Sequence, residues 1–285
     1  MPRQAPDQLV VTRATPEDWK LVVEWAAAEG WNPGLGDTAC FFSQDPDGFF
    51  LGRIDGEPVS AISVVNYSPD YAFLGFYLVR PDRRGRGHGL ATWKAALAHA
   101  GERTVGLDGV PAQQDNYRRS GFELAYRTNR YGGSGPTGHP APAHIVPAEA
   151  ADLDALIAYD GTHYPADRPT FLRNWLTANN HRALARVIDG KITGYGVIRP
   201  GRDAHRVGPL FADTADDARA LLDGLTADLD GAPFVIDVPE TNPEAVTLAT
   251  SLGLTSAFAT ARMYTGPVRP MATASIFGVT SLELG

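Results

Sequence analysis

The sequence predicts an α+β protein in which two domains of the same kind follow one another, each with a mixed, mostly antiparallel central sheet flanked by helices. Three observations support this prediction. Residues 48–79 contain three apolar, β-branched or aromatic runs separated by Asp-Gly at 55–56 and Ser-Pro-Asp at 68–70, which is typical of an antiparallel meander. Segments with helical spacing of apolar residues lie before and after these strands. The same order of elements returns after residue 144, so we expect an internal duplication.

In the first half, residues 9–13 are expected to form a strand and residues 14–30 the first helix. Thr15 can cap this helix, Pro16 suits its first position, and Asp18 completes a capping box. After the meander we expect a helix that ends at Gly101. A strand, a short helix and a final strand should follow, at residues 103–108, 113–120 and 122–131.

The second half is expected to repeat this order. A helix, a hairpin and then alternating strands and helices should occupy residues 148–160, 182–200, 206–213, 215–229, 233–238, 242–253 and 257–266. Between the halves, residues 131–144 hold four glycines and three prolines but few large apolar side chains, which is typical of a linker. We therefore expect a first domain, a linker and a second domain over residues 1–131, 132–143 and 144–285.

Composition narrows the class of protein. The 285 residues include 25 basic and 33 acidic side chains, for a formal net charge of -8. This charge disfavours a nucleic-acid partner, which needs a broad basic face, and mildly favours a cationic substrate. The longest apolar run is about half of the ~20 residues that a membrane-spanning helix needs, and the first residues lack the apolar stretch of a signal peptide. We expect a cytoplasmic protein without a membrane partner.

The candidate nucleophiles and metal ligands are few. Cys40 is the one cysteine, so no disulfide can form within the chain. No histidine lies near it in the sequence, and we expect a buried thiol. His163 and His181 lack metal-ligand spacing with other histidines, cysteines or carboxylates, so we expect no metal.

The most informative segment is RPDRRGRGHG at residues 80–89, which lies between an expected strand and an expected helix. Its three glycines allow backbone amides to approach a ligand and permit positive φ. The helix that follows adds unpaired N–H groups and the positive end of its dipole, and Arg84 and Arg86 can contact phosphate oxygens. The segment lacks the P-loop lysine and the spacing of the dinucleotide fingerprint. Two alternatives remain: a different kind of phosphate site, or a basic turn that caps a helix.

These residues carry a family resemblance. Arg84-x-x-Gly87-x-Gly89 resembles the acetyl-CoA pyrophosphate loop of the GNAT superfamily of N-acetyltransferases. NYRRSGF at 116–122 is similar to the Tyr-x-x-x-Gly-Phe ending of that superfamily's next motif, and the element order over residues 8–131 agrees with a GNAT domain. The whole chain resembles bacterial tandem-GNAT proteins, which also show GWNPG, here at 30–34, and a terminal FGVTSLELG.

The resemblance implies roles for individual residues. The backbone of Tyr77, Leu78 and Val79 would pair with the pantetheine arm as an added strand, and its amides would polarise the thioester carbonyl. Tyr117 would protonate the departing thiolate; the alternative is a structural aromatic beneath the Gly-Phe corner. Asn116 is a further candidate cofactor contact, although the family's asparagine position is occupied here by Val110. The pyrophosphate cradle would consist of Arg84, Gly85, Arg86, Gly87, His88 and Gly89.

Departures from the family concern the base and the acceptor. The strand that ends at Val79 has no carboxylate, so the best-placed candidate base is Asp108, for which the alternative is a structural Asp-Gly turn residue. The candidate acceptor-binding residues lie in the variable substrate loop of GNAT domains and beside the central strand. They are Trp31, Asn32, Asp37, which could hold a cation, and Tyr67. The alternative for each is loop packing.

The second half keeps Asn242-x-x-Ala245 but has Ala249 at the tyrosine position and no Arg/Gly loop. We expect a degenerate domain that supports the first, shapes the acceptor cleft or mediates a homodimer. The sequence thus predicts a metal-free, acetyl-CoA-dependent N-acetyltransferase that acts by direct attack on a small amine: an amino acid, a polyamine or an amino-sugar antibiotic. Two alternatives remain: a non-catalytic acyl-CoA sensor or scaffold, and an enzyme that acetylates protein N-termini or lysines.

Overall fold

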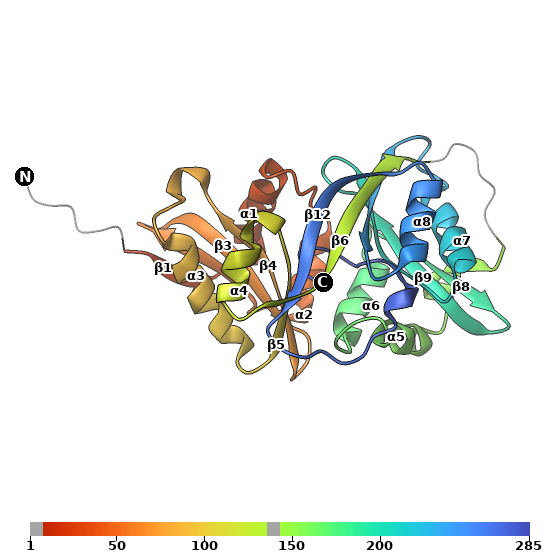
Figure 1. Cartoon of the computed structure of the whole chain (residues 1–285), viewed down its shortest axis with the longest axis horizontal. Coiled ribbons are helices and arrows are strands. Elements are labelled where there is room, and N and C mark those ends of the chain that lie inside the picture. The colour runs from red at the N-terminus through yellow and green to blue at the C-terminus, as the bar shows by residue number, and fades with distance from the viewer. Residues whose placement is uncertain (1–7, 136–142) are drawn as a thin grey trace, which may run out of the picture.

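The computed structural model describes residues 8–135 and 143–285, and its elements follow the predicted order (Figure 1). The first half comprises β1 (Val10–Arg13), α1 (Pro16–Ala28), α2 (Asp37–Gln44), β2 (Phe49–Ile54), β3 (Glu57–Asn66), β4 (Tyr71–Val79), α3 (His88–Leu97), β5 (Thr104–Gly109), α4 (Gln114–Arg119) and β6 (Glu123–Ser134). The second half comprises β7 (Ile145–Pro147), α5 (Leu153–Gly161), α6 (Pro169–Thr177), β8 (Arg182–Ile188), β9 (Lys191–Arg199), β10 (His205–Ala212), α7 (Ala215–Thr226), β11 (Pro233–Pro239), α8 (Pro243–Ser251), β12 (Thr255–Tyr264) and β13 (Ile276–Gly278).

Local sequence signals explain the first elements. The Asp18 amide donates to Thr15 Oγ1 at 3.2 Å, and the Thr15 amide donates to Asp18 Oδ2 at 2.9 Å. This confirms the predicted capping box of α1. Asp55 and Gly56 both have positive φ and turn β2 into β3, as expected of an Asp-Gly hairpin. β2, β3 and β4 then form the predicted antiparallel meander.

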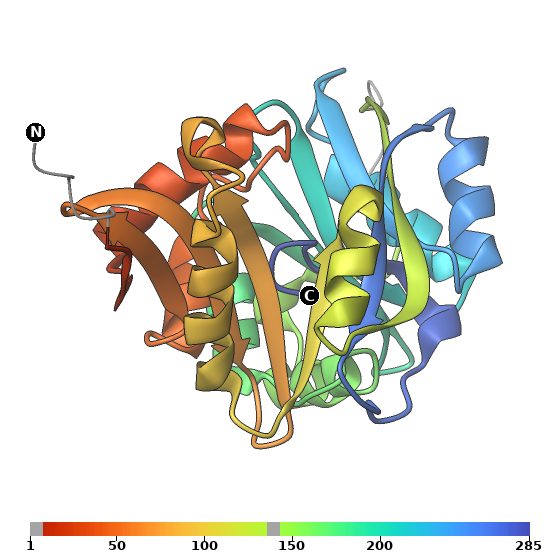
Figure 2. The ribbon, with the colours of Figure 1, turned by 60° about the vertical axis from the view of Figure 1, so that its left-hand side comes forward.

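One mixed sheet runs through both halves, because the halves exchange β6 and β12. Its order is β1-β2-β3-β4-β5-β12-β6-β11-β10-β9-β8-β7, with β13 paired to β10. Residues 128–134 of β6 pair with β11 of the second half, while β12 pairs with β5 of the first. β6 and β12 also pair with each other and form the joint between the halves (Figures 1 and 2).

The exchange corrects the predicted linker. Residues 132–134 continue β6 and pair with β11, and residues 136–142 lie outside the described part of the chain. At least one of the glycines that suggested a linker, Gly133, serves close packing instead. A Cβ added to Gly133 would lie 2.6 Å from Leu254 Cδ2 of the second half, a separation that folded proteins do not tolerate without movement.

The meander separates two cores. Alternate residues of β3, such as Ile62 and Val64, face α3 and α4, whereas Ala61 and Val65 face α1 and α2. The second of these cores continues into the other half, where it includes α5 and α6. None of the helices in the described residues is both long and apolar enough to span a bilayer.

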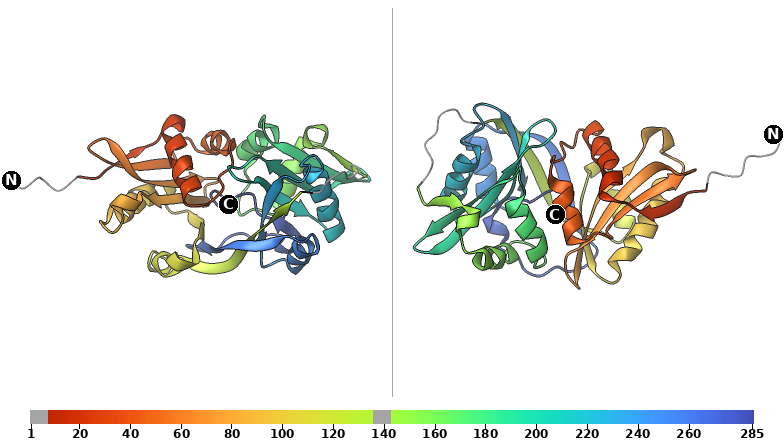
Figure 3. Two further views of the ribbon diagram at one scale, coloured as in Figure 1. Left: turned by 90° about the horizontal axis from the view of Figure 1, so that it is seen from above. Right: turned by 180° about the vertical axis from the view of Figure 1, so that it is seen from behind.

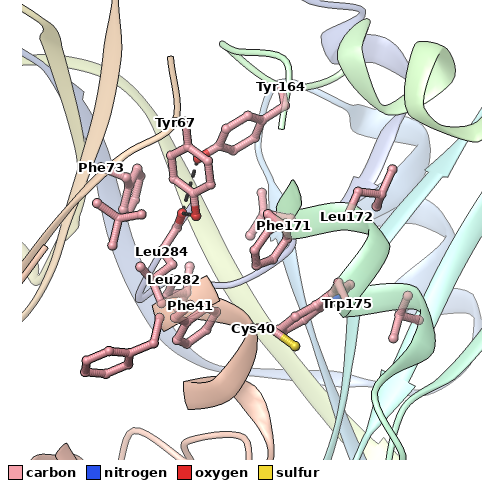
Figure 4. Packing of buried hydrophobic residues seen from close by; sticks show 14 of the residues in the cluster. Cys40, Phe41, Tyr67, Phe73, Tyr164, Phe171, Leu172, Trp175, Leu282 and Leu284 are labelled. Carbon is pink, nitrogen blue, oxygen red and sulfur yellow. Dashed lines mark hydrogen bonds between the residues drawn. The ribbon is translucent and has the colours of Figure 1, made fainter. Parts of the chain in front are cut away.

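Two helices that the sequence did not reveal, α2 and α6, join the halves. Phe41 of α2 stacks on Phe171 and Trp175 of α6 with ring centroids 6.2 and 5.8 Å apart (Figure 4). Such aromatic pairs contribute about 0.5–1.5 kcal/mol beyond their buried area. Cys40 is buried beside them, and burial raises the pKa of its thiol to about 12. The expectation of a buried thiol is therefore confirmed.

The last ten residues return from the second half toward the first, and all of them are buried. Figure 3 shows the C-terminus between the two halves. Tyr67 of the first half and Tyr164 of the second both donate hydrogen bonds to the Leu284 carbonyl, at 2.9 and 3.2 Å. The strand within this segment, β13, pairs with β10, so the first half's sheet is extended by β12 and not by β13.

Candidate active site

The first half opens a cleft where β4 and β5 part. The two strands pair in parallel from Tyr71 only as far as Leu74, which lies opposite Leu107. Beyond that point Phe76 has a φ of +47°, and the pairing with β3 shifts register. A non-glycine residue in this conformation costs about 1–3 kcal/mol and often marks a functional bend. β5 therefore offers no partner to Gly75–Val79, and an open edge of this kind can accept an extended ligand as an added strand.

Residues from both halves enclose a cavity of about 440 Å³ at this edge. β4, β5 and Tyr117 supply the side of the first half, together with Trp31. Phe258 and Thr260 come from β12 of the second half, and Leu282 and Glu283 come from the C-terminal segment. The cavity therefore exists only because the second half is in place.

Tyr117 lines both this cavity and a second cavity of about 870 Å³, and so lies between the two. The second cavity opens between α3 and α4, where Asn116 also lines it. Trp93 of α3 stacks on the Tyr117 ring with centroids 5.8 Å apart, and a Cβ added to Gly109 would overlap that ring from below. Burial raises the pKa of Tyr117 to about 12, so its hydroxyl keeps its proton at neutral pH.

The Arg/Gly loop leads from the open edge into α3. Gly85 and Gly87 have φ values of +75° and +82°, and added Cβ atoms there would meet nothing within 4 Å. Gly87 caps α3, of which His88 is the first residue. Two glycines with positive φ before a helix N-terminus present amides toward solvent, as anion sites do. Arg86 is exposed and adds positive charge.

Contacts of Arg84 and Gly89 hold the Arg/Gly loop against β4 and α1. The Arg84 side chain donates to the Val79 carbonyl at 3.0 Å and forms an ion pair with Glu29 at the end of α1. A Cβ added to Gly89 would lie 2.6 Å from the Tyr77 hydroxyl oxygen, so only glycine allows α3 to begin this close to β4. The structure thus brings the predicted backbone edge Tyr77–Val79 and the predicted cradle together.

Asp108 lies at the end of β5 and lines the cavity. Both of its carboxylate oxygens accept hydrogen bonds from Arg262 of β12, at 3.0 and 2.6 Å. Burial raises the pKa of Asp108 above that of a free aspartate, and the opposing effect of Arg262 does not cancel this rise. A buried carboxylate with a raised pKa accepts protons more readily.

The four predicted acceptor residues divide into one that lines the cavity and three that do not. Trp31 lines it. Asn32 instead donates to the Ala204 carbonyl at 3.0 Å and accepts from the Asp203 amide at 2.7 Å, which holds a turn of the second half. The Tyr67 hydroxyl donates its hydrogen bond to the Leu284 carbonyl of the C-terminal segment. For Asn32 and Tyr67 the prediction was wrong, because each side chain is buried against a distant part of the chain.

Asp37 requires the same correction. It is buried and accepts hydrogen bonds from Arg199 of β9 at 2.9 and 3.1 Å. Burial alone would raise its pKa, but Arg199, with His181 and Arg206, lowers it to about 2. The predicted role in binding a substrate cation is therefore wrong, because the cation beside Asp37 is the Arg199 side chain of this protein.

We expect Asp37→Asn to lower the free energy of unfolding by about 3–5 kcal/mol, because Arg199 would stay buried without its counter-charge. The pKa of Asp37, about 2 in the folded state against 3.8 for a free aspartate, makes its contribution complete above about pH 4 and lost as the pH falls toward 2. Urea unfolding at pH 7 and at pH 3 measures both effects. The control is Asp47→Asn, which breaks an exposed pair with Arg13 and should cost under about 1 kcal/mol. Equal losses in the two variants would contradict the prediction.

Sequence reasoning missed the residues that the second half contributes. Arg130 of β6 binds both carboxylate oxygens of Asp237 at 2.7 and 2.9 Å, and Arg206 binds Glu283 at 2.9 Å through each terminal nitrogen. Asp108 and Arg262 form a third buried ion pair. Each of these buried charges therefore has an opposite charge beside it. FGVTSLELG was the one available signal for this contribution, since it resembles a segment of tandem-GNAT proteins.

The fold and the cleft are those of acetyltransferases of the GNAT type. The GNAT family model matches residues 14–122, and a second GNAT domain model matches residues 156–278. The chain belongs to the GNAT acetyltransferase family and has two GNAT domains. It is 36% identical to Holothin acyltransferase of Pseudoalteromonas sp. (strain SANK 73390) over 275 residues, 95% of this chain and 93% of that protein. It is 24% identical to the uncharacterised N-acetyltransferase YitH of Bacillus subtilis (strain 168) over 201 residues, 67% of this chain and 69% of that protein.

Solved structures share the architecture. A Pyrococcus horikoshii protein, provisionally assigned as an acetyltransferase, matches with a TM-score of 0.80 at 21% identity and covers 100% of this chain and 99% of its own. A tandem GNAT protein from the clavulanic acid biosynthesis pathway matches with a TM-score of 0.63 at 18% identity over 91% and 99% of the two chains. At these identities the structural likeness shows the fold alone. The two family models and the tandem GNAT structure together confirm the predicted tandem-GNAT architecture.

Proposed function

We propose that this protein transfers an acetyl group from acetyl-CoA to the primary amine of a small molecule, by direct attack in a ternary complex. The observation that carries the proposal is the parting of β4 and β5 between the Arg/Gly loop and Tyr117, next to a cavity that the second half closes. The family and the similarity to Holothin acyltransferase support acyl transfer.

The residues present fit acetyl-CoA. The amides of the loop from Gly85 to Gly89, with Arg84 and Arg86, would hold the pyrophosphate. The edge Tyr77–Val79, to which β5 offers no partner, would hold the pantetheine arm, and the opening between α3 and α4 would admit it. Acetyl-CoA supplies the activated acyl group as a thioester.

The reaction needs three further contributions from the protein. Backbone amides at the β4 bend stabilise the negative charge that develops on the carbonyl oxygen when the amine nitrogen attacks. As the new C–N bond forms and the C–S bond breaks, Tyr117 gives its proton to the sulfur. Asp108 accepts the proton that the nitrogen loses. Exchange with solvent afterwards removes this proton from Asp108 and gives Tyr117 a new one. Trp31 and Phe258 supply aromatic walls for the acceptor.

A small acceptor is favoured over a protein because β12 and the C-terminal segment contribute walls to the cavity. A peptide would need an open groove there. An enzyme is favoured over a sensor because a protonated tyrosine lies beside the open edge. The 36% identical relative is named for holothin, which is therefore among the candidate acceptors.

Calorimetry with acetyl-CoA, followed by assays of CoA release, tests the proposal. We expect one acetyl-CoA per chain and CoA release with at least one of holothin, a polyamine, an amino acid or an amino-sugar antibiotic. Absence of acetyl-CoA binding would refute the proposal. Binding without CoA release from any amine would support the sensor, and release with a lysine peptide alone would support a protein acetyltransferase.

A further inference from the structure

The second half contains the counterpart of the open edge, but the chain itself fills it. β10 and β11 pair in parallel only from His205 to Val207, opposite Phe234 to Ile236, much as β4 and β5 do. β13 enters the gap beyond and pairs with Leu210 and Phe211 of β10. On the other side the Val279 amide donates to the Asp237 carbonyl of β11 at 2.9 Å. Backbone atoms of residues 276–279 thus occupy both edges of the gap.

The motif asparagine of the second half binds this segment. The Asn242 Nδ2 group donates to the Ile276 carbonyl at 3.2 Å, while its Oδ1 atom accepts from the Glu244 and Ala245 amides and caps α8. A Cβ added to Gly278 would lie 2.9 Å from Ile236 Cγ1. The segment is therefore seated closely, and the retained Asn-x-x-Ala sequence has a role without any cofactor.

From this anchorage the chain continues into the cleft of the first half. Glu283 is held by both terminal nitrogens of Arg206. Its backbone carbonyl lies so close to Gly75 that a Cβ there would overlap it. Figure 4 shows Leu282 and Leu284 next to Phe73 and Phe41 of the first half. The segment therefore touches β4 at the residue where that strand leaves β5.

The same residue marks where the acyl group would lie. In the proposed function, on which this inference rests, the thioester carbonyl meets the amides of the β4 bend. Acyl carbons beyond the carbonyl would then enter the cavity beside Gly75. Three apolar residues line the cavity: Leu74 of β4, Leu107 of β5 and Leu282 of the C-terminal segment. Leu74 and Leu107 are partners on adjacent strands of the first half. Leu282 is the one of the three that the C-terminal segment supplies.

We propose that residues 276–279 take the place of acyl-CoA in the second half and that Leu282, held by this anchorage, limits the length of the acyl group in the first half. The second half thus acts on the first through one segment. Leu282 is a specificity-determining residue whose effect can be measured by acyl-CoA binding alone, without knowledge of the acceptor.

Calorimetric titration with acetyl-CoA and hexanoyl-CoA tests the proposal on the whole chain. The wild type should bind one acetyl-CoA and bind hexanoyl-CoA at least tenfold more weakly. Leu282→Ala should narrow this ratio of dissociation constants at least fivefold. Leu282→Val, a smaller change, should shift the ratio in the same direction and serves if the alanine variant folds poorly.

The matched control is Leu284→Ala, the same truncation in the same segment. Leu284 is buried but does not line the cavity, so its loss should lower the melting temperature without changing the ratio. An unchanged ratio in the folded Leu282 variants, or the same change in Leu284→Ala, would overturn the role of Leu282. Two acetyl-CoA molecules per wild-type chain would overturn the filled second site. A wild type that binds neither acyl-CoA would refute the proposed function itself.

Discussion

Replacing Tyr117 by phenylalanine is expected to lower the rate of acetyl transfer about 100-fold and to leave the affinity for acetyl-CoA within about twofold. The change removes one oxygen atom. The phenylalanine ring can keep the stacking on Trp93 and the contact above Gly109, so the fold and the cofactor opening should survive. What is lost is the one tyrosine hydroxyl that the resemblance assigns to protonation of the leaving thiolate.

Tyr77→Phe is the matched control for this prediction. The Tyr77 ring also packs on Trp93, with centroids 5.1 Å apart, and also lines both cavities. Its assigned role belongs to its backbone, so loss of its hydroxyl should change turnover less than about threefold. Calorimetry gives the affinity and CoA release gives the rate for each variant. Full activity in Tyr117→Phe, or equal losses in both variants, would remove Tyr117 from the mechanism.

Gly87→Glu is expected to weaken acetyl-CoA binding at least 100-fold, about 2.7 kcal/mol. The position has a φ of +82° and open space around an added Cβ, so the variant should fold with a small penalty from the strained backbone. The new carboxylate would stand at the cap of α3, where the proposed pyrophosphate lies, and like charges there repel.

The control for the backbone strain is Gly56→Glu. Gly56 has a φ of +84° and equally open space around a Cβ, but it turns the hairpin between β2 and β3. Both variants place a glutamate on a backbone with positive φ and should be strained to a similar degree. Only Gly87→Glu should lose acetyl-CoA binding in a calorimetric titration. Retained affinity in Gly87→Glu would mean that RRGRGHG is a basic turn that only caps α3.

Features set by neighbouring residues could be predicted from the sequence. The capping box at Thr15, the Asp-Gly hairpin and the Arg/Gly loop before α3 each depend on residues a few positions apart. The wrong assignments depended on partners far along the chain. Asp37 is 162 residues from Arg199, Asn32 is 172 from Ala204 and Tyr67 is 217 from Leu284. No local pattern distinguishes a loop carboxylate that awaits a substrate from one that meets a buried arginine.

Composition failed at the boundary for a related reason. Glycines are frequent in linkers because they are flexible and frequent in crowded strands because they are small. Gly133 belongs to the second group, since Leu254 lies against it. The sequence of β6 does not show that its partner strand belongs to the other half.

The exchange of β6 and β12 makes the two halves inseparable as folding units. During synthesis, β5 is complete at residue 109 but meets its neighbour only when Ala261 has been made. Until then its edge stays open to other chains, a state that invites aggregation. A gene copy that encoded the first half alone would lack that neighbour and could not restore the sheet. Selection on the first half therefore also acts on the second, because the sheet of the first half is incomplete without β12.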